Sequence, residues 1–116
     1  MPYDEQLAER IRDLVVGEPG VTEKRMFGGL AFLVNGNLAV AASSRGDLMV
    51  RSDPAQADDL VDDVAVSRME MRGRRMEGWL RVTPDAVSSD DELGRWVEHG
   101  VVHAGSLPAK DAGERA

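Results

Sequence analysis

The feature that most constrains the fold is a turn sequence between two short apolar runs. Asn35-Gly36-Asn37 separates residues 30–34 from residues 38–42, and each of these runs is five residues long. Asn and Gly tolerate the positive φ values that a two-residue hairpin turn requires. The pattern therefore predicts two antiparallel strands joined by a tight turn.

Neighbouring segments extend this hairpin into a larger sheet. Residues 21–27 have strand character, residues 47–51 follow a second turn at 43–46, and residues 76–82 form a further predicted strand. Short turns between consecutive strands are typical of an antiparallel sheet. The pattern of residues 65–75 is left open, because Met69 and Met71 alternate with charged side chains and Gly73 interrupts the run.

Residues 3–16 are predicted to form the first helix. Apolar side chains recur there at intervals of three and four residues and make one stripe: Tyr3, Leu7, Ile11, Leu14 and Val15. We expect Gly17 to adopt a left-handed C-cap conformation and Pro19 to prevent the helix from resuming.

Two more helices are predicted in the second half of the chain. A short one follows Ser52 or Asp53, with Pro54 in its first turn. Its expected apolar face is Ala57, Leu60, Val61 and Val64, and its opposite arc is Asp58, Asp59, Asp62 and Asp63. The last helix, over about residues 90–104 after a cap at Ser89 or Asp90, has the expected core stripe Leu93, Trp96, Val97, Gly100, Val101 and Ala104.

These elements predict an α+β fold, an antiparallel sheet with flanking helices in the order α-β-β-β-β-α-β-α. The 116 residues are enough for one domain and too few for two. We expect residues 1–107 to form that domain and residues 108–116, which are small and polar, to form a flexible tail.

Composition excludes several classes of protein. The longest apolar runs have five residues, whereas a membrane-spanning helix needs roughly 20. The first residues lack the basic region and apolar stretch of a secretory signal, so we expect a cytoplasmic protein. The absence of cysteine excludes disulfides, thiolate metal sites and a cysteine nucleophile. A formal net charge of −7 disfavours direct binding to nucleic acid.

The two histidines are the first candidates for chemistry. His99 and His103 are four residues apart on the last predicted helix and therefore share a face, as zinc-binding pairs do, and Glu92 lies on the same flank. A closed zinc site needs further ligands that the sequence does not place. We therefore interpret both histidines as half-exposed boundary residues and predict no metal site.

A cluster of arginines is the second candidate. Arg68, Arg72, Arg74 and Arg75 fall within eight residues, and Arg81 follows. Arginine binds oxyanions through two parallel hydrogen bonds, so this strip could hold an anion or contact a partner. The alternative is that these side chains pair with the neighbouring carboxylates of residues 58–63 or with solvent, which is the more common role of charge runs.

The Gly28-Gly29 pair and the serines carry no recognisable catalytic motif. No Lys-Ser or Lys-Thr follows the glycines, so the pair does not match a phosphate-binding loop. We interpret it as a tight turn, with Met26 or Phe27 as a core anchor and at least one of the glycines at positive φ or at a crowded crossing. No serine lies in a nucleophile elbow. We predict no catalytic residue and no cofactor.

Several motifs together resemble the N-terminal domain of the TfoX/Sxy competence regulators. The specific element is Met26-Phe27-Gly28-Gly29 within residues 25–32, followed by the hairpin turn at residues 35–37. The similarity continues through residues 48–51 and through residues 73–79, which contain Gly73, Arg74, Met76 and Gly78. It ends with Leu93, Trp96-Val97 and residues 107–110, so it covers nearly the whole chain.

The resemblance implies an α+β fold similar to that of the type III secretion chaperones, in which helices pack against a curved antiparallel sheet and chains often pair into dimers. Members of the family act in natural transformation as co-activators with the cyclic-AMP receptor protein, and no catalytic residues are attributed to the domain. They also have a second, C-terminal domain, whereas this sequence ends at Ala116. We therefore expect the scaffold, rather than the competence role, to be shared.

The function predicted from the sequence is a non-enzymatic regulatory module that binds another protein, with a homodimer as one form of that pairing. The partner is not identified by the sequence, and neither a membrane nor nucleic acid is expected as one. The alternative is a small-anion binder, or an enzyme of unrecognised type, that uses the arginine strip from Arg68 to Arg81.

Overall fold

A computed structural model of the chain describes residues 4–26, 28–62, 64–71 and 74–109. In chain order, its elements are α1 (Glu5–Val15), β1 (Val21–Met26), β2 (Gly29–Val34), β3 (Asn37–Ala42), β4 (Leu48–Arg51), α2 (Pro54–Leu60), β5 (Val66–Met71), β6 (Arg74–Val82), the 3-10 turn η1 (Pro84–Val87) and α3 (Asp90–Ser106).

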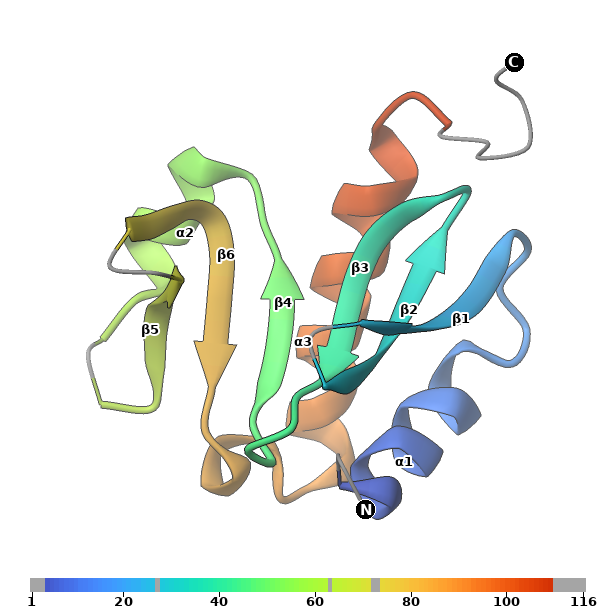
Figure 1. The fold of residues 1–116 in the computed structure, drawn as a ribbon, viewed down its shortest axis with the longest axis horizontal. Helices are drawn as coiled ribbons and strands as arrows, with labels where there is room; N and C mark the ends of the chain where they lie inside the picture. The colour runs from blue at the N-terminus through green and yellow to red at the C-terminus, as the bar shows by residue number, and fades with distance from the viewer. Residues whose placement is uncertain (1–3, 27, 63, 72–73, 110–116) are drawn as a thin grey trace.

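The strands form one antiparallel sheet of six strands in the order β1-β2-β3-β4-β6-β5. The α+β fold and the order of its elements are confirmed. The segment whose pattern the sequence left open contributes the edge strand β5, which pairs with β6 from Val66 opposite Val82 to Met71 opposite Arg74. In Figure 1 α2 and α3 lie behind the sheet, and α1 packs its apolar side chains into the same core as α3. Among the elements that the structure describes, one face of the sheet is thus covered by helices and the other carries none, and the latter is called the helix-free face.

The predicted hairpin is confirmed between β2 and β3. Asn35 and Gly36 have φ values of 52° and 83°, the left-handed conformations that a type I′ turn requires at both central positions. The pairing shifts register after Phe32, which stands opposite Val40, while Leu33 stands opposite Leu38. Ala39 is therefore an extra residue, and the strand has a β-bulge there.

The first helix begins as its acidic start predicts and ends differently. Asp4 is the N-cap and accepts hydrogen bonds from the backbone N–H groups of Gln6 and Leu7. The expectation of a left-handed cap at Gly17 is wrong, because Gly17 does not have positive φ and the left-handed residue is Gly20, with φ of 78°. The left-handed residue therefore lies directly before β1 rather than directly after α1.

The second helix is shorter than its apolar pattern suggests. Asp53 caps it, Pro54 occupies its first turn, and the chain is already extended at Val61. Val64 is 85% exposed, so its assignment to the apolar face is wrong. Asp62 lies beyond the helix and accepts hydrogen bonds from the N–H groups of the three residues that lead into β5.

The expected face of four aspartates therefore does not form. Asp58 and Asp59 are on α2, whereas Asp62 belongs to the turn after it. Asp63 lies outside the described residues. A carboxylate that caps three N–H groups in a turn stabilises that turn better than it would a helix interior, where the backbone N–H groups are already used.

The third helix follows its sequence signals closely. Ser89 and Glu92 form a capping box at its start. The predicted stripe faces the sheet: Leu93, Val97, Gly100 and Ala104 are buried, and Trp96 and Val101 are partly buried. A Cβ at Gly100 would lie 2.4 Å from the carbonyl oxygen of Ala39, so this glycine lets the helix cross directly over the bulge in β3.

The main core lies between the helices and the covered face of the sheet. Its largest fully buried side chains include Phe32, Leu48, Leu80 and Leu93, with Ile11 contributed by α1. No helix in the described part of the chain is long and apolar enough to span a membrane. The predicted tail starts against the sheet, because the side-chain amide of Asn37 donates to the carbonyl of Pro108 at 2.9 Å.

Candidate functional site

The Met26-Phe27-Gly28-Gly29 motif forms the turn between β1 and β2. Gly28 has φ of 75°, and a Cβ at Gly29 would lie 2.3 Å from the carbonyl oxygen of Ala42 on the neighbouring strand. The expectation of positive φ or a crowded crossing is confirmed for both positions. Met26 is partly buried, on the face of the sheet away from the helices. Phe27 lies outside the described residues.

The second part of the motif lies along β6. Gly78 has φ of 80°, and a Cβ there would lie 2.9 Å from the carbonyl oxygen of Ser52. Its own carbonyl accepts a hydrogen bond from the N–H of Ser52 at 2.7 Å. Gly78 therefore lets the start of α2 pass close to the sheet. Arg74 and Met76 belong to β6, but their side chains, like the whole of Gly73, lie outside the described part.

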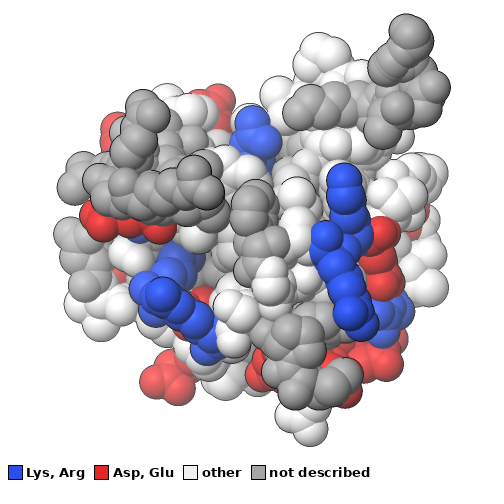
Figure 2. Space-filling view, in the orientation of Figure 1, with Lys and Arg blue, Asp and Glu red and all other residues white. Residues whose placement is uncertain are grey.

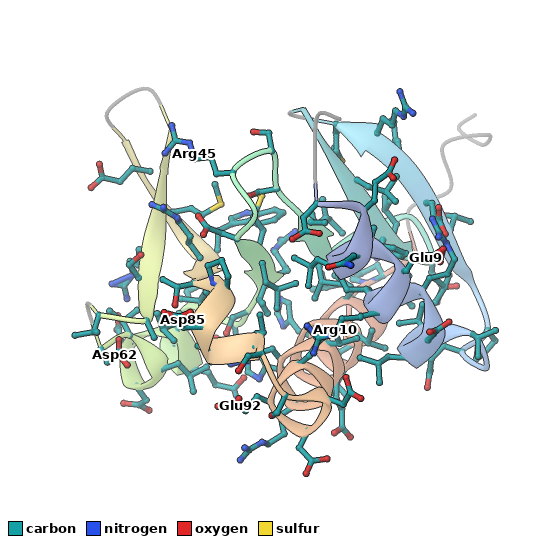
Figure 3. The ribbon with its side chains drawn as sticks, turned by 90° about the horizontal axis from the view of Figure 1, so that it is seen from below. Glu9, Arg10, Arg45, Asp62, Asp85 and Glu92 are labelled. Carbon is teal, nitrogen blue, oxygen red and sulfur yellow. The ribbon has the colours of Figure 1, made fainter. Side chains whose placement is uncertain are left out.

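The helix-free face of the sheet carries a second apolar cluster. Side chains alternate between the two faces along each strand. Every second side chain therefore points away from the helices. The cluster has four buried and four partly buried members: Ala31, Leu38, Ala41 and Met49, and then Met26, Leu33, Met69 and Trp79. In Figure 3 both edges of the sheet rise on this side, so the cluster lies in the hollow of a curved sheet.

Positive side chains flank this cluster. The guanidinium of Arg51 lies 5.3 Å from the ring centre of Trp79, within the range of a cation–π contact. Arg81 forms an ion pair with the buried Asp47. Lys24 stands opposite Ala31 and so belongs to the same face. Figure 2, which views this face, shows groups of Lys and Arg on its left and on its right.

The two arginines of the strip whose side chains the structure describes, Arg68 and Arg81, do not lie together. Arg68 pairs across the sheet with the buried Leu80 and forms an ion pair with Asp58 of α2, on the covered side. Arg81 pairs across the sheet with Ser67 and lies on the helix-free side, beside Asp47. Strand alternation thus places these two arginines on opposite faces.

The side chains of the other three arginines of the strip are not described. Arg72 lies outside the described residues, and Arg74 and Arg75 are described only through the backbone of β6. Among the side chains that the structure describes, no pair of arginines from the strip converges on one point, as bidentate recognition of one anion by two guanidinium groups would need.

A cleft of about 900 Å³ opens on the other side of the molecule, between α3 and the segment from α2 to β5. Apolar groups of its lining include Leu60, Trp96 and Val102. Its polar lining includes Asp53, Gln56, Asp62, Glu92, Arg95, Glu98, His99, His103 and Ser106. Both histidines and Glu92 thus lie in the wall of one cleft.

His99 is held by contacts on two sides. Its Nε2 atom lies 2.9 Å from the hydroxyl oxygen of Ser52, and its ring meets Trp96 edge to face, with centroids 6.2 Å apart. Burial lowers the pKa of His99, and the charge of His103 lowers it further. The imidazole is therefore neutral at neutral pH, as a hydrogen-bonding partner of a buried hydroxyl should be.

The Ser52 and His99 pair is positioned for structure rather than for nucleophilic attack. Ser52 is 0% exposed, and its hydroxyl also donates to the carbonyl of Asp53 at 3.1 Å. A nucleophile must reach the substrate, and a serine without accessible surface does not. The pair ties α3 to the junction of β4 and α2.

Glu92 is also committed to a structural role. Its carboxylate accepts from the hydroxyl of Ser89 at 3.0 Å in the capping box. Across the described ranges, no group of three or more His, Asp or Glu side chains is arranged to hold a metal ion. The histidine face that the sequence singled out is thus brought into a cleft, where its neighbours are Trp96 and Ser52.

Sequence reasoning missed two features of these sites. The helix-free cluster had a signal, because Met49, Met69 and Trp79 occupy alternate positions of strands whose other side chains face the core. The contact between Ser52 and His99 had none, since its partners are 47 residues apart in the chain.

The family model of the TfoX N-terminal domain matches residues 13–104, which is most of the chain. The matched region starts within α1 and ends within α3, so it includes the whole sheet and the lining of the cleft except Ser106. Comparisons with curated proteins and with solved structures give no significant match.

Proposed function

Because the chain belongs to the TfoX N-terminal domain family, we propose that it is a non-enzymatic regulatory module that acts by binding another protein. We propose further that its contact surface is the helix-free face of the sheet. The observation that carries this proposal is the apolar cluster around Met49 and Trp79, over which the described part of the chain places no helix.

The composition of this face is that of an interface centre. Protein interfaces are enriched in aromatic residues, Met and Arg and depleted in Lys, Glu and Asp. The face contains Trp79, three methionines and the arginines Arg51 and Arg81, with one Lys and one Asp, Lys24 and the Asp47 that pairs with Arg81. Met side chains adapt their shape to a partner, which favours them at binding surfaces. The flanking positive charges favour a partner whose own surface is acidic around an apolar patch.

Two observations support a non-enzymatic role. Ser52, the serine that contacts a histidine, has no exposed surface, and Glu92 is used in a helix cap. The alternative of a small-anion binder finds little support in the strip itself, because Arg68 and Arg81 lie on opposite faces and each is paired with a carboxylate. Direct binding to nucleic acid is not proposed for a chain with a net charge of −7.

Site-specific crosslinking tests the contact surface. Met69, which is partly buried on the helix-free face, is replaced by a photo-crosslinking amino acid, and the protein is irradiated in lysate of its native host. The matched control carries the same amino acid at Val16, which is 83% exposed after α1. We expect a discrete adduct from position 69 and none from position 16.

Mass spectrometry of the adduct identifies the partner. A second copy of this chain would make the partner a homodimer, and a different chain would identify a heterologous one. Either result supports the proposal. Equal labelling from both positions, or no adduct from position 69, would overturn it.

A thermal-shift screen separates the proposal from the small-anion alternative. Ligands that bind the folded state raise the melting temperature. We expect no shift with nucleotides, inorganic phosphate or divalent metal ions. A saturable shift with phosphate that disappears in Arg81→Gln would instead favour the anion binder.

A further inference from the structure

We propose that the cleft between α3 and the α2–β5 segment is a second binding site, which takes a short apolar peptide segment flanked by Lys or Arg. This site lies on the helix side of the molecule, away from the face proposed above. In Figure 3 Asp62 and Glu92 mark the helix side below the sheet, whereas the helix-free face is uppermost. The inference is therefore independent of the proposed function.

The apolar lining of the cleft includes surface that is exposed to solvent. Val102 is 63% exposed on α3 and lines the cleft, although the neighbouring Val101 packs against the core. Leu60 and Trp96 are partly buried and also line the cleft. An apolar side chain seated among these three residues would remove Val102 from water, which is favourable in proportion to the apolar area covered.

The charged side chains that line the cleft favour an occupant with positive charge. Four carboxylates line it, those of Asp53, Asp62, Glu92 and Glu98, against the single guanidinium of Arg95. The two histidines add no charge to this balance when neutral, and the pKa of His99 is lowered by burial. The pKa of Asp62 is also lowered, because its carboxylate accepts backbone N–H groups, so it stays ionised.

This balance differs from that of the helix-free face, where Lys24, Arg51 and the ion pair of Arg81 with Asp47 lie around the apolar cluster. Complementary charge steers association and rejects partners of the wrong sign. An apolar segment with acidic flanks suits the helix-free face, and one with basic flanks suits the cleft. The two surfaces would therefore not compete for one partner.

The size of the cleft suits a peptide segment. Ligand sites commonly have volumes of about 300–1,000 Å³, and this cleft, at about 900 Å³, lies near the upper end. The high exposure of Val102 shows that the site is open rather than enclosed. An open groove with an apolar strip and charged rim matches the way in which amphipathic peptides bind, through a few apolar anchors.

The probe is a synthetic peptide with two central leucines, flanked on each side by one Arg and one Lys. Binding is followed by ¹H–¹⁵N NMR of the labelled full chain. The two tryptophans report on the two surfaces, because Trp96 lines the cleft and Trp79 lies on the helix-free face. We expect saturable shifts of the Trp96 indole N–H, with the Trp79 indole N–H unchanged.

Two pairs of variants test the charge and the apolar contact. Glu98→Lys, in the cleft, is compared with Glu18→Lys, an exposed position outside it with the same change of net charge. We expect about three- to tenfold weaker binding for Glu98→Lys, the effect of reversing one surface charge, and little change for the control. Val102→Ser, at a position that is 63% exposed, should weaken binding, whereas Val16→Ser, 83% exposed but outside the cleft, should not.

Three results would overturn the proposal. The first is the absence of a saturable shift up to about 1 mM peptide. The second is equal weakening by Glu98→Lys and Glu18→Lys, which would show unspecific attraction to an acidic protein. The third is a shift of the Trp79 indole in place of Trp96. A peptide in which Glu replaces the four cations should not bind, and equal binding of that peptide would also contradict the proposal.

Discussion

On the covered face of the sheet, large side chains such as Phe32, Leu48 and Leu80 are fully buried beneath helices. On the opposite face, the same strands carry Ala31, Ala41 and Met49, with Trp79 and Met69 only partly buried. The backbone is shared, and each strand supplies both surfaces by alternation. The difference shows that the covered face packs large side chains into the main core, while the helix-free face holds a separate cluster whose members are buried or partly buried without a described helix over them.

The side chains of the helix-free face can also change shape more easily than those of the covered face. Small alanines and flexible methionines fill the hollow of the sheet, and a ring and a guanidinium stack at its side. Shape-specific packing of branched and aromatic side chains makes a unique core. A surface rich in Met tolerates changes of shape at modest cost. We therefore expect substitutions on the two faces to act on different properties.

The largest expected effect is on the covered face. Phe32→Ala should lower the free energy of unfolding by about 3–5 kcal/mol, because it removes a fully buried ring and leaves a cavity. Leu33→Ala, one residue later on the free face and only partly buried, should cost much less. Urea denaturation of both variants measures the difference. Equal losses would show that the two faces are packed alike.

The second largest loss of stability is expected at Gly29, where the neighbouring strand lies close on the helix-free face. Gly29→Val should cost about 1–3 kcal/mol, because its Cβ would clash with the carbonyl oxygen of Ala42. Gly17→Val is the control, since no atom lies within 4 Å of a Cβ there and its φ is not positive. Thermal unfolding compares them. If Gly29→Val melts like the parent protein but loses an interaction, the motif is a ligand site rather than a structural turn.

A smaller effect is expected at the rim of the free face. Arg51→Ala should cost about 0.5–1 kcal/mol by removing the cation–π contact with Trp79. The same variant should also weaken the adduct formed through position 69. Arg45→Ala, an exposed position in the turn before β4, should change neither property. A loss of stability without any loss of crosslinking would place the partner elsewhere.

The smallest effect is expected from titration on the covered side. The pKa of His99 is lowered from 6.5, first by burial and then by His103, so the unfolded state binds this proton more readily. Stability should therefore fall as the pH drops through about 6.5. His99→Gln, which keeps a polar group near Ser52, should show a shallower fall in melting temperature between about pH 7.5 and 5.5. The same slope in both proteins would contradict this role.

Local patterns in the sequence were sufficient for most of the fold. The turn at Asn35-Gly36, the capping box of Ser89 and Glu92, and the buried stripe of α3 all depend on residues close together in the chain. The end of α2 was misjudged because Val61 and Val64 continue a helical apolar period. Asp62 instead binds three backbone N–H groups, and Val61 is extended.

The candidate sites are formed by contacts between residues far apart in the chain, and local sequence patterns do not predict such contacts. Arg68 and Arg81 looked like one strip, yet strand pairing places them on opposite faces. The cleft required α3 to lie beside the α2–β5 segment, and His99 to meet Ser52 across 47 residues of sequence.

The sequence by itself determined the helices, the hairpin and the antiparallel class of the sheet, because backbone conformation and side-chain period are properties of neighbouring residues. Only the tertiary structure decided which face of the sheet the helices cover and which charges line the cleft. Those outcomes follow from where Gly100 lets α3 cross β3 and from which strands become neighbours. Both are contacts between distant segments, and burial selects them only when the whole chain packs.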